Sequence, residues 1–130
     1  MTLTSLLVID DDPDFNTLVK FLLEKDTNWE IFTASDGEEG VVLAKSQQPS
    51  VILLDVIMPK FDGLDIYKLL KSDLTTCEIP IIFVTAMVRM KKIIKSKITE
   101  DIEVIIKPFN IMKLVGQIIN VCDHYSVINN

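Results

Sequence analysis

Polar residues follow four apolar runs of the sequence, at the point where each run ends. The first run is followed by three aspartates, and the later runs by an aspartate, a threonine and a lysine: Asp10, Asp11, Asp12, Asp55, Thr85 and Lys107. If the runs are parallel strands of one sheet, their carboxyl ends share one edge, so these side chains converge on a single crevice. Carboxylates, a hydroxyl and an ammonium together predict a site that binds a cation and reacts with a phosphoryl group.

The aspartates predict a metal site. Two carboxylates about 4 Å apart repel by about 4 kcal/mol at an effective dielectric constant near 20, so a site that holds several of them attracts a cation. Oxygen ligands without nearby histidine or cysteine favour a hard ion that keeps several waters, which is typical of Mg²⁺, with Mn²⁺ as the alternative. An aspartate beside such an ion, a lysine and a threonine hydroxyl is suited to attack phosphorus. The cluster therefore predicts an aspartyl phosphate site.

The elements that position these residues alternate along the chain. Apolar runs of strand length alternate with stretches of helical spacing, five of each, as a parallel α/β sheet requires. The expected strands are Leu6 to Ile9, Trp29 to Ala34, Val51 to Leu54, Ile81 to Val84 and Val104 to Ile106. The expected helices are Phe15 to Leu23, with Leu18 in its apolar stripe, Gly37 to Ser46, Gly63 to Ser72, Arg89 to Thr99 and Ile111 to Cys122. We predict an α/β fold: a doubly wound five-stranded parallel sheet with five helices on both faces.

Length and charge limit the class of protein. A chain of 130 residues suits one domain, residues 1–130, with no output domain expected after the last helix. Its net charge of −6, from 13 basic and 19 acidic residues, opposes binding to nucleic acid or anionic lipid. No apolar run reaches the roughly 18 residues that span a bilayer, and no export signal is visible. We expect a cytoplasmic protein without nucleic-acid or membrane partners.

Five short motifs at these strand ends resemble the response-regulator receiver domain of two-component signalling. They are Val8 to Pro13, Leu53 to Pro59, Asp62-Gly63, Val84 to Ala86 and Lys107 to Phe109. The resemblance covers nearly the whole chain and implies a flavodoxin-like sheet of strand order 2-1-3-4-5. It also implies a signalling protein instead of an enzyme, with at most slow autophosphorylation from small donors and slow autodephosphorylation. We expect either a stand-alone receiver or a fragment of a longer regulator.

The resemblance assigns roles to the site residues. It implies that Asp55 accepts a phosphoryl group from a phosphohistidine on a sensor histidine kinase or phosphotransfer protein. Asp10 and Asp11 match the acidic pair that holds Mg²⁺, together with Asp55 and the backbone carbonyl of Ile57. Thr85 is expected to turn its hydroxyl toward the phosphoryl oxygens.

Lys107 is expected, by the same resemblance, to pair with the phosphoryl oxygens. The peptide bond between Lys107 and Pro108 is expected to be cis, a state that X-Pro bonds reach at low cost. Two further aspartates have ordinary structural roles in this interpretation, since Asp12 and Asp62 each precede an expected helix and are suited to cap it.

Three positions depart from the family pattern. Receivers usually carry an aromatic residue three positions before the lysine, and here that residue is Val104. The positions two after the acceptor and two after the threonine, which tune attack by water in the family, are Ile57 and Met87. Because neither side chain can orient a water molecule, we predict a comparatively long-lived phosphoaspartate.

The expected fourth helix is a basic stripe on an acidic protein. It holds five of the thirteen basic residues: Arg89, Lys91, Lys92, Lys95 and Lys97. By resemblance this helix, the strand Val104 to Ile106 and the last helix form the surface that relays the signal to a downstream protein, which would then carry an acidic patch. The alternative is a solvated helix face without a partner.

Two other functions stay open. The first is a receiver-like protein-binding module that phosphorylation does not regulate, for which the absent aromatic at Val104 is the hint. The second is a phosphatase of the haloacid dehalogenase type with Asp10 as nucleophile, since Asp10 to Asp12 satisfies an Asp-x-Asp spacing. That class also expects a threonine or valine two residues after the second aspartate, a later acidic pair and a cap insertion, which the sequence lacks.

Overall fold

Five strands alternate with five helices along the part of the chain that the structure, a computed structural model, describes: residues 4–58, 62–107 and 110–129, with side chains as far as residue 123. The strands are β1 (Ser5–Ile9), β2 (Glu30–Ala34), β3 (Val51–Asp55), β4 (Ile81–Thr85) and β5 (Val104–Ile106). The helices are α1 (Pro13–Asp26), α2 (Gly37–Gln47), α3 (Gly63–Ser72), α4 (Arg89–Lys97) and α5 (Ile111–Asn129).

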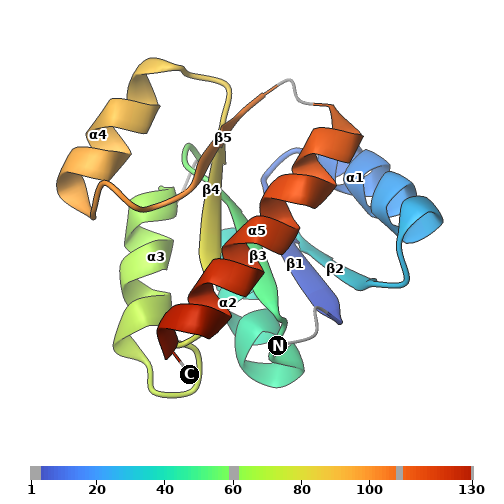
Figure 1. The fold of residues 1–130 in the computed structure, drawn as a ribbon, viewed down its shortest axis with the longest axis horizontal. Coiled ribbons are helices and arrows are strands. Elements are labelled where there is room, and N and C mark those ends of the chain that lie inside the picture. The colour runs from blue at the N-terminus through green and yellow to red at the C-terminus, as the bar shows by residue number, and fades with distance from the viewer. Residues whose placement is uncertain (1–3, 59–61, 108–109, 130) are drawn as a thin grey trace.

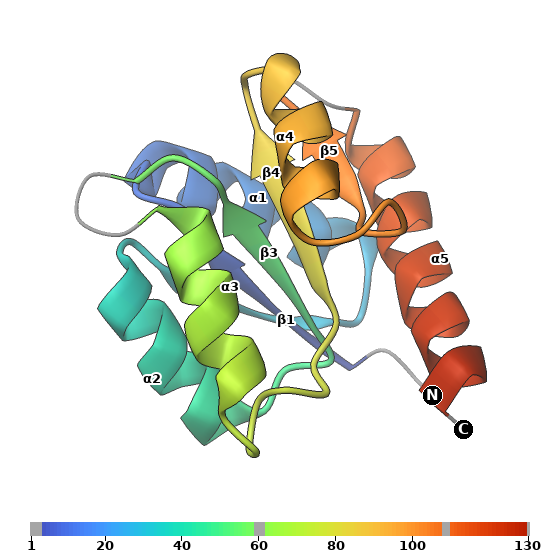
Figure 2. The same cartoon turned by 90° about the vertical axis from the view of Figure 1, so that its left-hand side faces the viewer.

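All strand pairs are parallel, and the sheet order is β2-β1-β3-β4-β5. Helices α1 and α5 pack on one face of the sheet, and α2, α3 and α4 on the other (Figures 1 and 2). The predicted doubly wound fold and its strand order are confirmed. From β1 the chain adds β2 on one side and then β3 on the other side. In sheets of this topology, ligands bind at the carboxyl ends of the strands next to such a switch point.

Alternate residues of each strand enter two separate apolar clusters. Leu7 and Ile9 of β1 pack toward α2, α3 and α4, whereas Leu6 and Val8 pack toward α1 and α5. β1, β3 and β4 are buried along their whole length and are apolar on both sides, as their continuous apolar runs predict. In these strands only the ends are left for polar residues.

The apolar stripe predicted for the first helix is partly wrong. Leu18 was expected to face the sheet, but its side chain is 56% exposed. The face of α1 that meets the sheet runs through Asn16, Val19 and Leu23, at spacings of three and four residues. Leu18 lies beside this line, because a leucine adjacent to Val19 is turned by about 100° around the helix axis.

Aspartate is the N-cap residue of three of the described helices. Asp12 accepts hydrogen bonds from the backbone N–H groups of Asp14 and Phe15, and Asp62 accepts one from Asp65. Both predicted caps are confirmed, and Asp36 caps α2 in the same way. Helix α4 differs, since Val88 occupies its cap position and no side chain bonds there. Within the described residues, no helix is both long and apolar enough to cross a membrane.

Candidate functional site

The polar residues predicted to meet do so at the carboxyl edge of the sheet. Asp10 and Asp11 follow β1, Asp55 ends β3 and Thr85 ends β4. Lys107 follows β5, and its backbone N–H donates to the carbonyl of Thr85 at 2.8 Å. The parallel pairing of β1, β3, β4 and β5 therefore brings all five residues to one edge.

Asp10 is the buried centre of this site. Its side chain is only 2% exposed and forms an ion pair of 2.6 Å between Oδ2 and the Nζ atom of Lys107. The other oxygen, Oδ1, accepts a hydrogen bond of 3.0 Å from the backbone N–H of Asp12. The negative charge of Asp10 is therefore balanced inside the protein by one ammonium and one amide.

Asp55 carries a strongly perturbed carboxyl group. Burial raises its pKa from 3.8 to about 7, and the nearby negative charges of Asp10 and Asp11 add to this effect. The positive charge of Lys107 and the backbone N–H of Ile57 act in the opposite direction. A carboxyl group that resists ionisation so strongly is a sign of a site that lacks positive charge.

Three carboxylates can share one cation. One oxygen from each of Asp10, Asp11 and Asp55 lies within 4.8 Å of the others, two of these side chains being buried and Asp11 exposed. A hard divalent ion such as Mg²⁺ takes oxygen ligands of this kind and would supply the positive charge that Lys107 alone does not. The donor set fits Mg²⁺. The carbonyl of Ile57 stays a predicted ligand.

Thr85 lies beneath the site with 1% of its surface exposed. Its hydroxyl oxygen accepts a hydrogen bond of 3.1 Å from the backbone N–H of Met87, which leaves the hydroxyl proton to be donated elsewhere. Val104, where receivers usually carry an aromatic residue, is 3% exposed and packs in the core with Phe83 and Ile94. The predicted cis bond involves Pro108, which lies outside the described residues.

Gly63 was predicted only as a flexible residue near a helix start, and its role in the site was missed. Its N–H donates to the carbonyl of Val56 at 2.6 Å, and a Cβ atom built on it would lie 2.3 Å from the carbonyl oxygen of Asp55. Its φ is not positive, so a glycine is required here by space and not by backbone conformation. The Asp-Gly pair was the only signal in the sequence.

Two residues of α1 were also missed. Asn16 is 4% exposed and donates from Nδ2 to the carbonyls of Asp10, at 2.8 Å, and Ala34, at 3.2 Å, which ties the ends of β1 and β2 together. Phe15 places its ring beside the ammonium of Lys107. The sequence showed Phe15 only as part of an apolar stripe, since nothing in its spacing indicates a partner ninety residues away.

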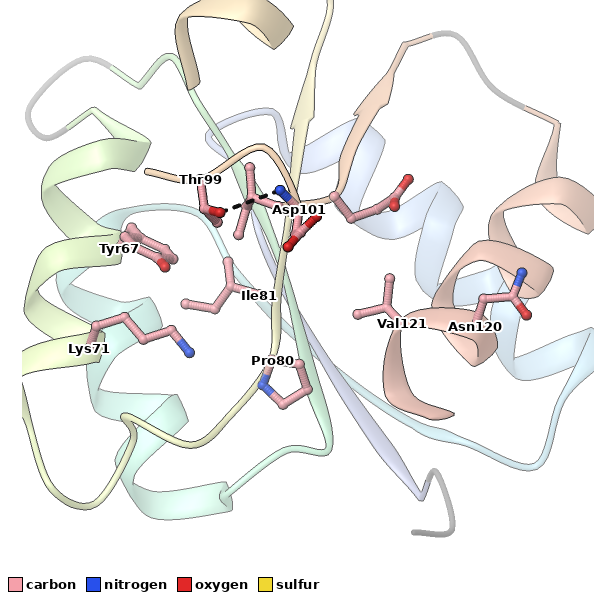
Figure 3. Close-up of a pocket in the computed structure, with 10 residues that line it drawn as sticks. Tyr67, Lys71, Pro80, Ile81, Thr99, Asp101, Asn120 and Val121 are labelled. Carbon is pink, nitrogen blue, oxygen red and sulfur yellow. Dashed lines mark hydrogen bonds between the residues drawn. The ribbon is translucent and has the colours of Figure 1, made fainter. Parts of the chain in front are cut away.

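A hollow of about 420 Å³ lies away from the carboxylates. Tyr67 and Lys71 of α3 form one wall, Pro80 and Ile81 the floor, and Val121 of α5 the opposite wall (Figure 3). The hollow opens at the amino end of β4, whereas Asp55 and Thr85 lie at the carboxyl ends of their strands. It is therefore separate from the acidic site.

The fold and the acidic edge identify the class of protein. Residues 6–119 match the family model of the response regulator receiver domain. The chain belongs to this family. Receivers are signalling modules that bind Mg²⁺ at an acidic pocket, and response regulators take phosphoryl groups from histidine kinases.

The individual relatives have low sequence identity to this chain. The DNA-binding dual master transcriptional regulator RpaA of Synechocystis is 32% identical over 113 residues, which are 87% of this chain and 46% of RpaA. Protein PilH of Pseudomonas aeruginosa is 35% identical over 80 residues, 62% of this chain and 65% of PilH. The structure of the chemotaxis protein CheY4 of Vibrio cholerae superposes with a TM-score of 0.81 at 26% identity, covering 92% of this chain and 99% of the CheY4 chain. The chain spans about half the length of RpaA.

Proposed function

We propose that this chain takes up a phosphoryl group on Asp55 from a phosphohistidine of a sensor histidine kinase or phosphotransfer protein, and that its changed shape is read by a downstream protein. The observation that carries the proposal is the position of Asp55. It is 8% exposed, close to two other aspartates and electrostatically coupled to Lys107 at the end of a buried strand. We also propose a cytoplasmic location, which agrees with this partner.

The transfer joins an oxygen of Asp55 to phosphorus while the bond between phosphorus and the donor nitrogen breaks. Mg²⁺, held by Asp10, Asp11, Asp55 and the carbonyl of Ile57, would stabilise the charge on the phosphoryl oxygens. The carboxyl group of Asp55 must be ionised to attack, so any cation that lowers its raised pKa favours the reaction.

Lys107 and the hydroxyl of Thr85 then act on the phosphoryl oxygens. The ammonium of Lys107 lies 2.6 Å from Asp10 in the structure, so it has to share or leave this partner to reach a phosphoryl group on Asp55. Thr85 already binds the N–H of Met87 through its oxygen, and a turn of its hydroxyl would pull the segment that leads into α4. With Val104 in place of an aromatic, we propose that the signal reaches the α4, β5 and α5 surface through this segment.

The first test is the intact mass of the protein after incubation with Mg²⁺ and acetyl phosphate. One phosphoryl group is expected on the wild type and none on Asp55→Asn, because the amide is a poor nucleophile. Asp14→Asn, an exposed change in the first turn of α1, is the control and should be labelled like the wild type. An adduct on Asp55→Asn would point to Asp10 and the phosphatase alternative, and no adduct on any protein would favour a binding module that is not phosphorylated.

The phosphoaspartate is expected to be long-lived. Ile57 is 51% exposed beside Asp55 and offers water no hydrogen-bonding group. Ile57→Asn is expected to shorten the lifetime about tenfold, the effect of one hydrogen bond worth about 1.4 kcal/mol to the attacking water. The decay of the adduct after removal of the donor measures this, with Val42→Asn on α2, 63% exposed, as the control. Equal lifetimes for wild type and Ile57→Asn would contradict the interpretation.

The exposed basic residues of α4 are the proposed contact for an acidic patch on the downstream protein. Arg89, Lys91 and Lys92 are exposed in the first turn of the helix, and this turn contains no acidic residue. Lys95 differs, since its Nζ atom donates to the carbonyls of Glu100, at 2.7 Å, and Ile102, at 2.9 Å. Lys95 therefore closes the turn after α4, and the contact is proposed for the other three.

A further inference from the structure

The ammonium of Lys107 lies between a carboxylate and an aromatic ring. Its Nζ atom is 2.6 Å from Oδ2 of Asp10 and 4.0 Å from the centre of the Phe15 ring. An ammonium at this distance from the ring centre is attracted by the negative face of the aromatic system. The Lys107 side chain is only 21% exposed, although lysine normally extends its charge into water.

The structure fixes Phe15 in this place through the start of α1. Asp12 caps the helix and accepts a hydrogen bond of 3.3 Å from the backbone N–H of Phe15. The ring packs against the apolar cluster between the sheet and α1, so it is held from its backbone and from its side chain. Lys107 comes from the other end of the chain, after β5, and meets this ring from across the site.

We infer that Phe15 is a positioning residue for Lys107, an inference that rests on the proposed function. The ring face keeps the flexible ammonium inside the acidic site, where it neutralises Asp10 before phosphorylation and is close to Asp55 when the phosphoryl group arrives. A lysine without this support carries a strongly hydrated ammonium on a flexible four-carbon side chain, and this ammonium spends more of its time in solvent.

Loss of the Phe15 ring is expected to have opposite effects on Mg²⁺ binding and on phosphorylation. Lys107 forms an ion pair with Asp10, which is also a proposed ligand of Mg²⁺. A loosely held Lys107 therefore competes less with the metal for the carboxylate of Asp10. The same loose lysine is less often near Asp55 to stabilise the transferred group. Loss of the ring is therefore expected to tighten Mg²⁺ binding and to slow phosphorylation, a combination that a general weakening of the fold does not produce.

The variants are Phe15→Leu, which removes the ring, and Phe15→Tyr and Phe15→Trp, which keep one. Phe21→Leu is the matched control, because Phe21 lies on the same helix with its side chain 63% exposed. The first readout needs no metal and no phosphodonor: the proton shifts of the ε-methylene group of Lys107 by NMR. A ring face above this group moves these signals upfield. The upfield position is expected in wild type, both aromatic variants and Phe21→Leu, and is expected to be lost in Phe15→Leu.

The second readout is the Mg²⁺ dissociation constant and the rate of labelling by acetyl phosphate. Phe15→Leu is expected to bind Mg²⁺ roughly two- to tenfold more tightly and to be labelled slower by a similar factor, with recovery in Phe15→Tyr and Phe15→Trp. An unchanged Lys107 signal in Phe15→Leu, or weaker Mg²⁺ binding, would overturn the inference. If the NMR shift is lost but even the wild type is never labelled, the contact is real and the proposed function, together with the role in phosphorylation, fails.

Discussion

Replacing Lys107 with methionine is expected to lower the free energy of unfolding of the metal-free protein by about 3 kcal/mol near neutral pH. Methionine keeps the length and packing of the side chain but removes the ammonium that lies 2.6 Å from Asp10. Asp10 is then a buried carboxylate, 2% exposed, whose remaining hydrogen-bond partner among the described residues is the backbone N–H of Asp12. Removing one member of a buried ion pair costs more than the pair contributes, because the other charge is left unpaired.

The cost of Lys107→Met should grow with pH. The pKa of Asp55 is already raised to about 7 in the folded protein, and Lys107 is the charge that lowers it. Without Lys107 the folded-state pKa rises further above the unfolded value near 4. A raised carboxyl pKa reduces stability as the pH climbs from the unfolded to the folded pKa. The wild type stops losing stability from this group near pH 7, and the variant continues to lose it, so the difference is larger at pH 8 than at pH 5.

Mg²⁺ should restore much of the lost stability. The metal binds only the folded protein and raises its stability by RT ln(1 + c/Kd), where c is the concentration of free Mg²⁺. Because Lys107→Met lacks the competitor for Asp10, its midpoint of thermal unfolding should rise more with millimolar Mg²⁺ than that of the wild type. Thermal and urea unfolding with and without Mg²⁺ measure this. Lys92→Met, on the exposed side of α4, is the control. A smaller Mg²⁺ effect in Lys107→Met than in the wild type would show that Asp10 is not a ligand.

The sequence was sufficient for the fold and for the members of the acidic site. Continuous apolar strands and strand-end polar residues depend on local patterns, and the parallel sheet converts these patterns into one edge. This is why Asp10, Asp55 and Lys107 could be predicted to meet although ninety-seven positions separate the first from the last. Asp12 and Asp62 were predictable for the same reason, since a cap acts on its own helix.

Contacts between elements were not predictable in this way. The contact between Phe15 and Lys107 depends on how the start of α1 and the residue after β5 are placed relative to each other, which no local spacing encodes. The hydrogen bonds that Lys95 donates to two carbonyls were not predicted either, because they depend on the path of the chain after α4. Leu18 was misplaced because the neighbouring apolar residues of α1 offer more than one apolar stripe, and only the packing against the strands decides which stripe is buried.

Among Gly40, Gly63 and Gly116, substitution by alanine is expected to cost the most stability at Gly63. The added carbon would lie 2.3 Å from the carbonyl oxygen of Asp55 and 2.8 Å from Cα of Val56, and both are backbone atoms that no rotamer change can move. We expect a loss of about 3 kcal/mol or more in the free energy of unfolding, at the upper end of the cost of overpacking. Labelling by acetyl phosphate should also slow, because the backbone that must shift carries Asp55.

Two other glycines provide graded controls for this prediction. At Gly40 a Cβ atom would meet the end of the Ile9 side chain at 2.6 Å, which a rotation of that side chain can relieve, so Gly40→Ala should cost less than Gly63→Ala. At Gly116, exposed on α5, nothing lies within 4 Å, and alanine should stabilise the helix by about 0.5–1 kcal/mol. Urea unfolding of the three variants measures the order. If Gly63→Ala were as stable as the wild type, the close approach of α3 to the backbone of Asp55 would be wrong, and with it the account of how β3 and α3 hold the acceptor in place.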